Sequence, residues 1–177
     1  MSVPTSGRKL NVGSLFSGTG GLDLGLERAG LRVAWQVEND PACNRVLERH
    51  WPSVKRYGDM RDVRGADLAP VDLVCGGFPC QPVSQAGKRL GTADNRWLWP
   101  EMCRVIEAVR PAWVLCENVP GIISLGLDEV LADLEGAGYT CWPFGIPACA
   151  LDAPHIRLRI FVLAPSESGT LRGCERE

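Results

Sequence analysis

The sequence predicts one α/β domain, with a mostly parallel sheet and helices on both of its faces. Short apolar runs typical of buried strands alternate with amphipathic helical segments along the chain. A length of 177 residues suits one domain, and 45% hydrophobic with 23% charged residues is ordinary for a globular protein. We expect a flexible N-terminus at residues 1–9, the domain at 10–164, and a tail at 165–177 that is disordered or cut short.

The first predicted unit is a strand, a glycine-rich turn and a helix. Residues 10–16 form a short apolar run, and the Ser-Gly-Thr-Gly-Gly sequence at 17–21 interrupts it. Apolar residues then recur with the helical period until Gly30, a residue favoured just beyond a helix C-terminus. This order predicts backbone N–H groups that converge at the start of a helix, where a carboxylate or phosphate binds well.

The second predicted unit is a strand at 32–37 followed by a helix. Asp40 is a favoured N-cap residue, and Pro41 suits the first helical position, so we place this helix from 41 to about 50. Further strands are predicted at 71–75, 112–117, 139–146 and 160–164, and further helices at 97–109 and 127–134.

Composition excludes several classes of protein. The net charge of -2 lacks the basic signature of a self-sufficient nucleic-acid binder. No apolar run approaches the roughly 18 residues that span a bilayer, and the N-terminus does not resemble a secretory signal. The eight cysteines include no C-x-x-C pair and only two histidines accompany them, so we expect no zinc site. A reduced, cytoplasmic protein is predicted, with Cys75, Cys103 and Cys116 as core residues.

One cysteine differs from the others, because Cys80 lies in a Pro-Cys-Gln-Pro turn directly after the apolar run at 71–75. Gly76 and Gly77 precede the turn and allow another backbone or a ligand to approach closely. A cysteine between two prolines on a strand-end loop suits a nucleophile better than a core position. A merely structural loop is the alternative.

The first two units together suggest a cofactor site. Glu38 follows the second strand and lies 20 residues after Gly18, the separation at which an acidic residue commonly binds ribose hydroxyls. The turn is G-x-G-G and not G-x-G-x-x-G, so a nucleoside that carries an amino-acid carboxylate suits it better than a pyrophosphate. We therefore predict S-adenosylmethionine; an ordinary tight turn with a solvated Glu38 is the alternative.

Six segments, taken in order, resemble the motifs of the C5-cytosine DNA methyltransferase family. They are residues 15–22, 37–40, 58–59, 76–84, 117–119 and 155–159. The resemblance implies a Rossmann-like S-adenosylmethionine-dependent methyltransferase fold, truncated at the C-terminus, with no metal. It also implies a cofactor site formed by Phe16, Ser17, Gly18, Thr19, Gly20, Gly21, Leu22, Glu38, Asn39, Asp59 and Pro79.

The resemblance implies catalytic roles for Cys80, Glu117, Arg157 and Arg159. Cys80 would add to C6 of a cytosine, Glu117 would protonate or hydrogen-bond N3, and Arg159 would hold O2, with Arg157 supporting Cys80 or the backbone. We expect the two arginines to lie on one strand edge and to point the same way. A polar strand end at Glu117 and a solvated face at the two arginines are the alternatives. Lys88, Arg89 and Arg96 follow the cysteine and are candidates for phosphate contacts, or for an ordinary solvated loop.

The family's chains normally continue for another hundred residues or more, with a target-recognition domain and two further motifs. Three interpretations follow: a catalytic half that needs a second chain to act on double-stranded DNA, an inactive truncated copy, or a non-catalytic S-adenosylmethionine-binding partner subunit. An RNA substrate is less favoured, because the Phe-Pro-Cys-Gln-Pro sequence resembles that of bacterial DNA enzymes. Without the last motif's helix, we expect an exposed apolar patch near the strand at 10–16.

Overall fold

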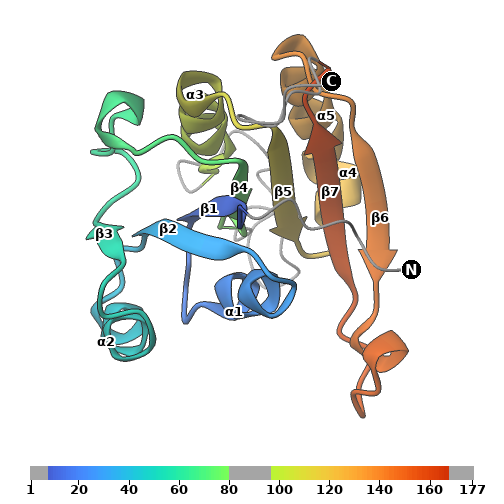
Figure 1. The fold of residues 1–177 in the computed structure, drawn as a ribbon. Helices are drawn as coiled ribbons and strands as arrows, with labels where there is room; N and C mark the ends of the chain where they lie inside the picture. Colours follow the sequence, from blue (N-terminus) through green and yellow to red (C-terminus); the bar gives the residue numbers. More distant parts are fainter. Residues whose placement is uncertain (1–7, 80–96, 168–177) are drawn as a thin grey trace.

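Seven strands form one sheet in the order β3-β2-β1-β4-β5-β7-β6 in a computed structural model that describes residues 8–79 and 97–167 (Figure 1). The pairs among β1 to β5 are parallel, whereas β7 runs antiparallel to both of its neighbours. The predicted mostly parallel sheet is therefore confirmed. The strands are β1 (Asn11–Leu15), β2 (Arg32–Val37), β3 (Lys55–Tyr57), β4 (Leu73–Gly76), β5 (Trp113–Asn118), β6 (Trp142–Ile146) and β7 (Arg159–Pro165).

Helices cover both faces of this sheet, as predicted. One face carries α1 and α2, and the other carries α3 and α5, so that the sheet is the middle of three layers (Figure 1). The helices are α1 (Gly21–Arg28), α2 (Pro41–His50), α3 (Trp99–Val109), α4 (Ile122–Leu125) and α5 (Leu127–Gly136), with short 3-10 turns η1 (Gly65–Asp67) and η3 (Ala148–Leu151). Asp40 caps α2 as expected, because its Oδ1 accepts from the N–H groups of Ala42 and Cys43 at 2.7 and 2.8 Å.

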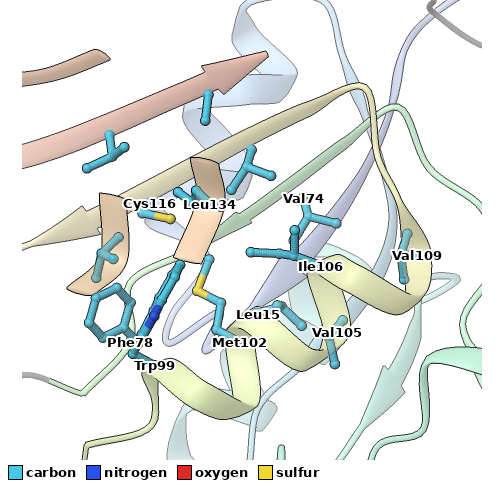
Figure 2. Packing of buried hydrophobic residues seen from close by; sticks show 14 of the residues in the cluster. Leu15, Val74, Phe78, Trp99, Met102, Val105, Ile106, Val109, Cys116 and Leu134 are labelled. Carbon is cyan, nitrogen blue, oxygen red and sulfur yellow. The ribbon is translucent and has the colours of Figure 1, made fainter. Parts of the chain in front are cut away.

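The main core lies between the sheet and α3. Leu15, Val74 and Cys116 project from three neighbouring strands onto Met102 and Ile106 of the helix (Figure 2). All five side chains are at most 2% exposed, so this layer is dry and close-packed. Cys75 is also fully buried, as expected, whereas Cys103 is only partly buried.

Short elements account for most of the differences from the predicted layout. The three-residue β3, the four-residue α4, η1 and η3 are too brief to show a period, and none was predicted. Residues 165 and 166 still belong to the sheet: Pro165 ends β7, and Ser166 forms a β-bridge with Tyr139 and donates its N–H to the Ala112 carbonyl at 2.9 Å. The predicted tail therefore overlaps the sheet in its first residues, and 168–177 lie outside the described residues, as do 1–7.

A bulge in β2 sets which of its residues face α1. The pairing of β2 with β1 shifts between Val12 and Gly13, so Ala34 has no directly opposite partner. Trp35 then lies against Gly13, where any Cβ would come within 2.0 Å of the indole ring, and its Nε1 donates to the Ala69 carbonyl at 2.9 Å. As a result Gln36 is fully buried on the α1 side of the sheet.

Three strands at one end of the sheet have no described helix on the α1 side. Helices α1 and α2 lie over β1 to β4, and no described helix lies in front of β5, β7 and β6 in Figure 1. The side chains there are apolar: Trp142 is 54% and Phe144 41% exposed, and Phe144 stacks on Phe161 with ring centroids 5.8 Å apart. An apolar patch is therefore present over β5, β7 and β6, and not near the strand at 10–16 where we expected one.

Candidate active site

The predicted site residues that the structure describes gather at one edge of the sheet, because the carboxyl ends of β1, β2, β4 and β5 meet there. Phe16 follows β1, Glu38 follows β2, Gly77 follows β4, and Glu117 lies at the end of β5. In parallel α/β sheets this edge is where ligands bind.

The glycine-rich turn between β1 and α1 needs glycine for two separate reasons. Gly18 and Gly20 adopt left-handed backbone conformations, with φ of 56° and 84°. A Cβ on Gly20 would also lie 2.4 Å from the Trp51 ring, so the turn packs directly on the end of α2. The Ser17 N–H donates to the Val37 carbonyl at 3.1 Å, which ties the turn to β2.

Glu38 is held by backbone hydrogen bonds on both of its carboxylate oxygens. Oε2 accepts from the Gly18 N–H at 2.7 Å, and Oε1 accepts from the Asp40 N–H at 2.8 Å. The carboxylate thus joins the glycine-rich turn to the start of α2. Each oxygen retains a free lone pair, so the group can still accept from two hydroxyls of a ligand.

A cleft opens beside Glu38, between the ends of β1, β2 and the segment after β3. Five predicted cofactor residues line it: Phe16, Glu38, Asn39, Asp59 and Pro79. The remaining predicted residues, 17–22, form the turn and the first residues of α1 instead, and the Leu22 side chain packs toward the sheet. Val37, Gly58, Met60 and Leu98 line the cleft as well and were not among the predicted cofactor residues.

Asp59 presents a carboxylate at this cleft. The Arg61 N–H donates to its Oδ1 at 2.9 Å, and this bond is the first cause that lowers the Asp59 pKa below its ordinary value. The side chain is therefore a charged acceptor at neutral pH, suited to an exocyclic amino group.

The backbone that leads into Cys80 is anchored on both sides. Phe78 is buried and meets Trp97 edge-on, with ring centroids 5.4 Å apart, and it packs against Trp99 at the same separation. The Asn118 side chain donates to the Phe78 carbonyl at 3.3 Å. Cys80 itself lies outside the described residues, as do Lys88, Arg89 and Arg96. Phe78 and Trp97, which the structure does describe, are in contact beside β5.

Glu117 and Arg159 form an ion pair at the end of β5. Their Oε1 and Nε atoms are 2.9 Å apart, and each side chain is 25% exposed. Burial raises the pKa of Glu117 above its ordinary value, while Arg159 and then Arg157 act in the opposite direction. Gly77 makes room for this carboxylate, since a Cβ there would lie 2.8 Å from Glu117 Oε2.

The two arginines are not on one strand, contrary to expectation. β7 begins at Arg159, and Arg157 precedes it with a left-handed φ of 31°, so strand alternation does not govern its direction. Both guanidinium groups nevertheless act on the Glu117 carboxyl. Because β7 runs antiparallel, its first residue lies beside the last residues of β5, which brings Arg159 to the same edge as Glu117.

Two further findings concern metal ions and membranes. Among residues 8–79 and 97–167, no group of three His, Cys, Asp or Glu side chains is arranged to hold a metal ion. No described helix is long and apolar enough to cross a membrane.

Known proteins resemble this chain over most of its length. A family model described as C-5 cytosine-specific DNA methylase matches residues 10–172. The type II methyltransferase M2.BsuMI of Bacillus subtilis is 38% identical over 165 residues, which cover 88% of this chain and 42% of that protein. The type II methyltransferase M.AquIA of Picosynechococcus sp. is 40% identical over 172 residues, which cover 85% of this chain and 69% of that protein.

Solved structures share the fold. A putative DNA modification methyltransferase encoded within an Escherichia coli prophage superposes with a TM-score of 0.76 at 28% identity, over 90% of this chain and 47% of that one. The Spodoptera frugiperda DNMT2 structure, at 20% identity and a TM-score of 0.75, supports the fold alone. The chain thus spans less than half of M2.BsuMI and of the prophage methyltransferase, 53% of the DNMT2 structure and 69% of M.AquIA.

Proposed function

Since this chain belongs to the C-5 cytosine-specific DNA methylase family, we propose that it is the catalytic part of a DNA (cytosine-5-)-methyltransferase that uses S-adenosylmethionine. The observation that carries the proposal is the half-buried Glu117–Arg159 pair, which lies at the same sheet edge as the Glu38 cleft and the lead into Cys80. A polar strand end without a function would not require this combination of a burial-raised pKa, a guanidinium partner and a glycine that makes room for it.

The residues of the cleft fit this cofactor. Glu38 retains lone pairs for ribose hydroxyls, Asp59 is an ionised acceptor for an adenine amino group, and Phe16 supplies an apolar wall. The N–H groups at the start of α1 suit the carboxylate of the amino-acid part. When bound, S-adenosylmethionine supplies the activated methyl group.

The reaction needs a nucleophile because C5 of cytosine is not reactive enough to take a methyl group unaided. In the proposed sequence the Cys80 thiolate adds to C6, which makes C5 enamine-like and able to form the bond to the methyl carbon. As the bond from C5 to the methyl carbon forms, the bond from that carbon to the donor sulfur would break and release S-adenosylhomocysteine. Solvent would then take the proton on C5, and the bond between Cys80 and C6 would break to restore the thiolate. The base must leave the duplex stack for these steps to occur.

Glu117 and the two arginines would handle the cytosine ring. Addition at C6 places negative charge on the ring, and a protonated Glu117 relieves it by donating to N3. The burial that raises the Glu117 pKa favours this protonated form. Arg159, which lies beside Glu117, would donate to O2, and Arg157 would support Cys80 or the backbone.

A second chain is proposed to complete the enzyme. M.AquIA supports this, because a match of similar length covers 69% of it but only 42% of M2.BsuMI, so that relative is itself a much shorter chain. The bare face over β5, β7 and β6 offers an apolar surface for the complementary segment. We place the assembled enzyme on double-stranded DNA in the bacterial cytoplasm.

The test is the transfer of a labelled methyl group from S-adenosylmethionine to mixed-sequence duplex DNA. The chain is assayed alone and with a second chain that corresponds to the remaining length of its relatives. We expect incorporation that is lost in Cys80→Ser and kept in Cys149→Ser, a matched control at an exposed cysteine. Incorporation that survives Cys80→Ser would contradict the covalent mechanism. Cofactor binding without transfer under both conditions would support a non-catalytic subunit instead.

A further inference from the structure

A buried polar cluster lies directly beneath the glycine-rich turn. Asp23, in the first turn of α1, and Gln36, on β2, are both fully buried, and Gln36 Nε2 donates to Asp23 Oδ2 at 2.7 Å. Ser14 of β1 pairs in register with Gln36 on one side and with Cys75 on the other. Asp23 therefore sits over three neighbouring strands in the layer between α1 and the sheet.

Two atoms of this cluster lack a hydrogen-bond partner. They are Asp23 Oδ1 and Gln36 Oε1, and they are the only such buried side-chain atoms in the described part of the chain. Both are acceptors if Asp23 is ionised, and buried acceptors without donors are costly. Both belong to one pair whose other two atoms are already bonded, so a single proton on Oδ1, donated to Oε1, would satisfy them together.

We propose that Asp23 is a protonated carboxylic acid that forms a closed pair of hydrogen bonds with the Gln36 side-chain amide, and that this neutral pair positions the cofactor turn. Gln36 Nε2 donates to one oxygen of Asp23, and the other oxygen of Asp23 donates its proton to Gln36 Oε1. The pair fastens the first turn of α1 to β2, two residues before Glu38.

The charges around the pair favour the neutral acid. Burial is the largest cause that raises the Asp23 pKa, and Glu27 on the same helix raises it further, whereas Ser14 and Gln36 lower it. From β4 the facing titratable group is Cys75, whose own pKa burial raises strongly, so it is an uncharged thiol. None of the described groups that act on the Asp23 pKa is a cation.

The neutral state has a consequence for the site, on the premise of the proposed function. An ionised Asp23 would place a negative charge beneath the start of α1, where the cofactor carboxylate is proposed to bind. The protonated acid leaves the partial positive charge of the helix start available. Ser17 of the turn donates to Ser14 Oγ at 2.9 Å, so the turn and the pair are linked through Ser14.

Carboxyl-carbon NMR of the chain labelled at aspartate tests the protonation directly and needs no cofactor. We expect one resonance, assigned through bonds and absent from Asp23→Asn, to keep the shift of a protonated acid at pH 7. An Asp23 resonance at the ionised position throughout pH 5–8, with or without a buried water beside it, would overturn the proposal.

The positioning role is tested with a conservative rescue. Asp23→Asn preserves both hydrogen bonds as an amide–amide pair, so we expect S-adenosylmethionine affinity within twofold of the parent chain and a loss of at least tenfold in Asp23→Ala. Asp23→Asn should also remove a pH dependence of unfolding, because a raised pKa gives stability that is present below the unfolded pKa and lost as pH rises through the folded one. Equal losses in Asp23→Asn and Asp23→Ala would overturn the role. If the parent chain binds no cofactor, the proposed function fails while the NMR and unfolding results still decide this inference.

Discussion

Glu38 and Glu117 end two strands at the same edge of the sheet, yet their surroundings are opposite. Both oxygens of Glu38 accept backbone N–H groups, so its position is set by the chain around it. Glu117 has a side-chain partner, Arg159, and burial raises its pKa. The comparison indicates that Glu38 belongs to a preformed receptor, whereas Glu117 is an acid whose proton affinity depends on the two arginines beside it.

Removing the acid should have the largest effect of any change at this pair of sites. Glu117→Gln keeps the shape but lacks the transferable proton, so we expect methyl transfer by the assembled enzyme to fall by about 10²–10⁴-fold. S-adenosylmethionine affinity, measured by calorimetry, should stay within twofold. A drop in affinity comparable to the drop in rate would show that the two carboxylates are not separate in function.

The reciprocal change at Glu38 should affect binding first. Glu38→Ala leaves the Gly18 and Asp40 N–H groups without their acceptor, so we expect S-adenosylmethionine affinity to fall by about 10–100-fold and the free energy of unfolding by about 2 kcal/mol. Denaturant titration and calorimetry measure the two effects. Glu38→Gln is the control, because its amide oxygen can replace one acceptor; a full loss in this variant would show that the charge is essential.

A smaller effect is expected where space alone is changed. Gly77→Ala places a methyl group 2.8 Å from Glu117 Oε2, so the carboxylate must shift. Overpacking of this kind costs about 1–3 kcal/mol, and we expect methyl transfer to fall by about tenfold. Cofactor affinity should not change. Gly25→Ala, where a Cβ meets no atom within 4 Å, is the matched control and should match the parent rate.

The smallest effect is a displacement of the pH profile. Arg159 lowers the Glu117 pKa against the rise caused by burial, so Arg159→Met should raise that pKa. Because the protonated form acts, the fall of kcat with rising pH should then occur at a higher pH than in the parent, whatever the height of the profile. If kcat falls at the same pH in Arg159→Met as in the parent, a group other than Glu117 controls this part of the pH profile.

The sequence predicted the position of Glu38 at this edge better than it predicted the residues that pack around and beneath the cleft. Glu38 is found from the 20-residue spacing to Gly18, a pattern that local turn geometry imposes. Met60 and Leu98 of the cleft carry no such pattern, because they meet only through packing between distant segments. Asp23 and Gln36 also escaped prediction, since the bulge at Ala34 that turns Gln36 inward leaves no periodic trace. β3 has only three residues and shows no alternation.

The reversed direction of β7 has a practical consequence for protein engineering. Pro165 pairs with Trp113 at the edge where the parallel strands begin, while Phe161 pairs with Glu117 near the other edge. A segment fused after β7 therefore starts about 20 Å from the reactive edge, the length of seven strand residues. A flexible tether of about 13 residues has that reach on average. A single-chain version that joins a complementary segment here would need a linker of about six residues if it is fully extended, and of about 13 if it is to reach the Glu117 edge without being stretched.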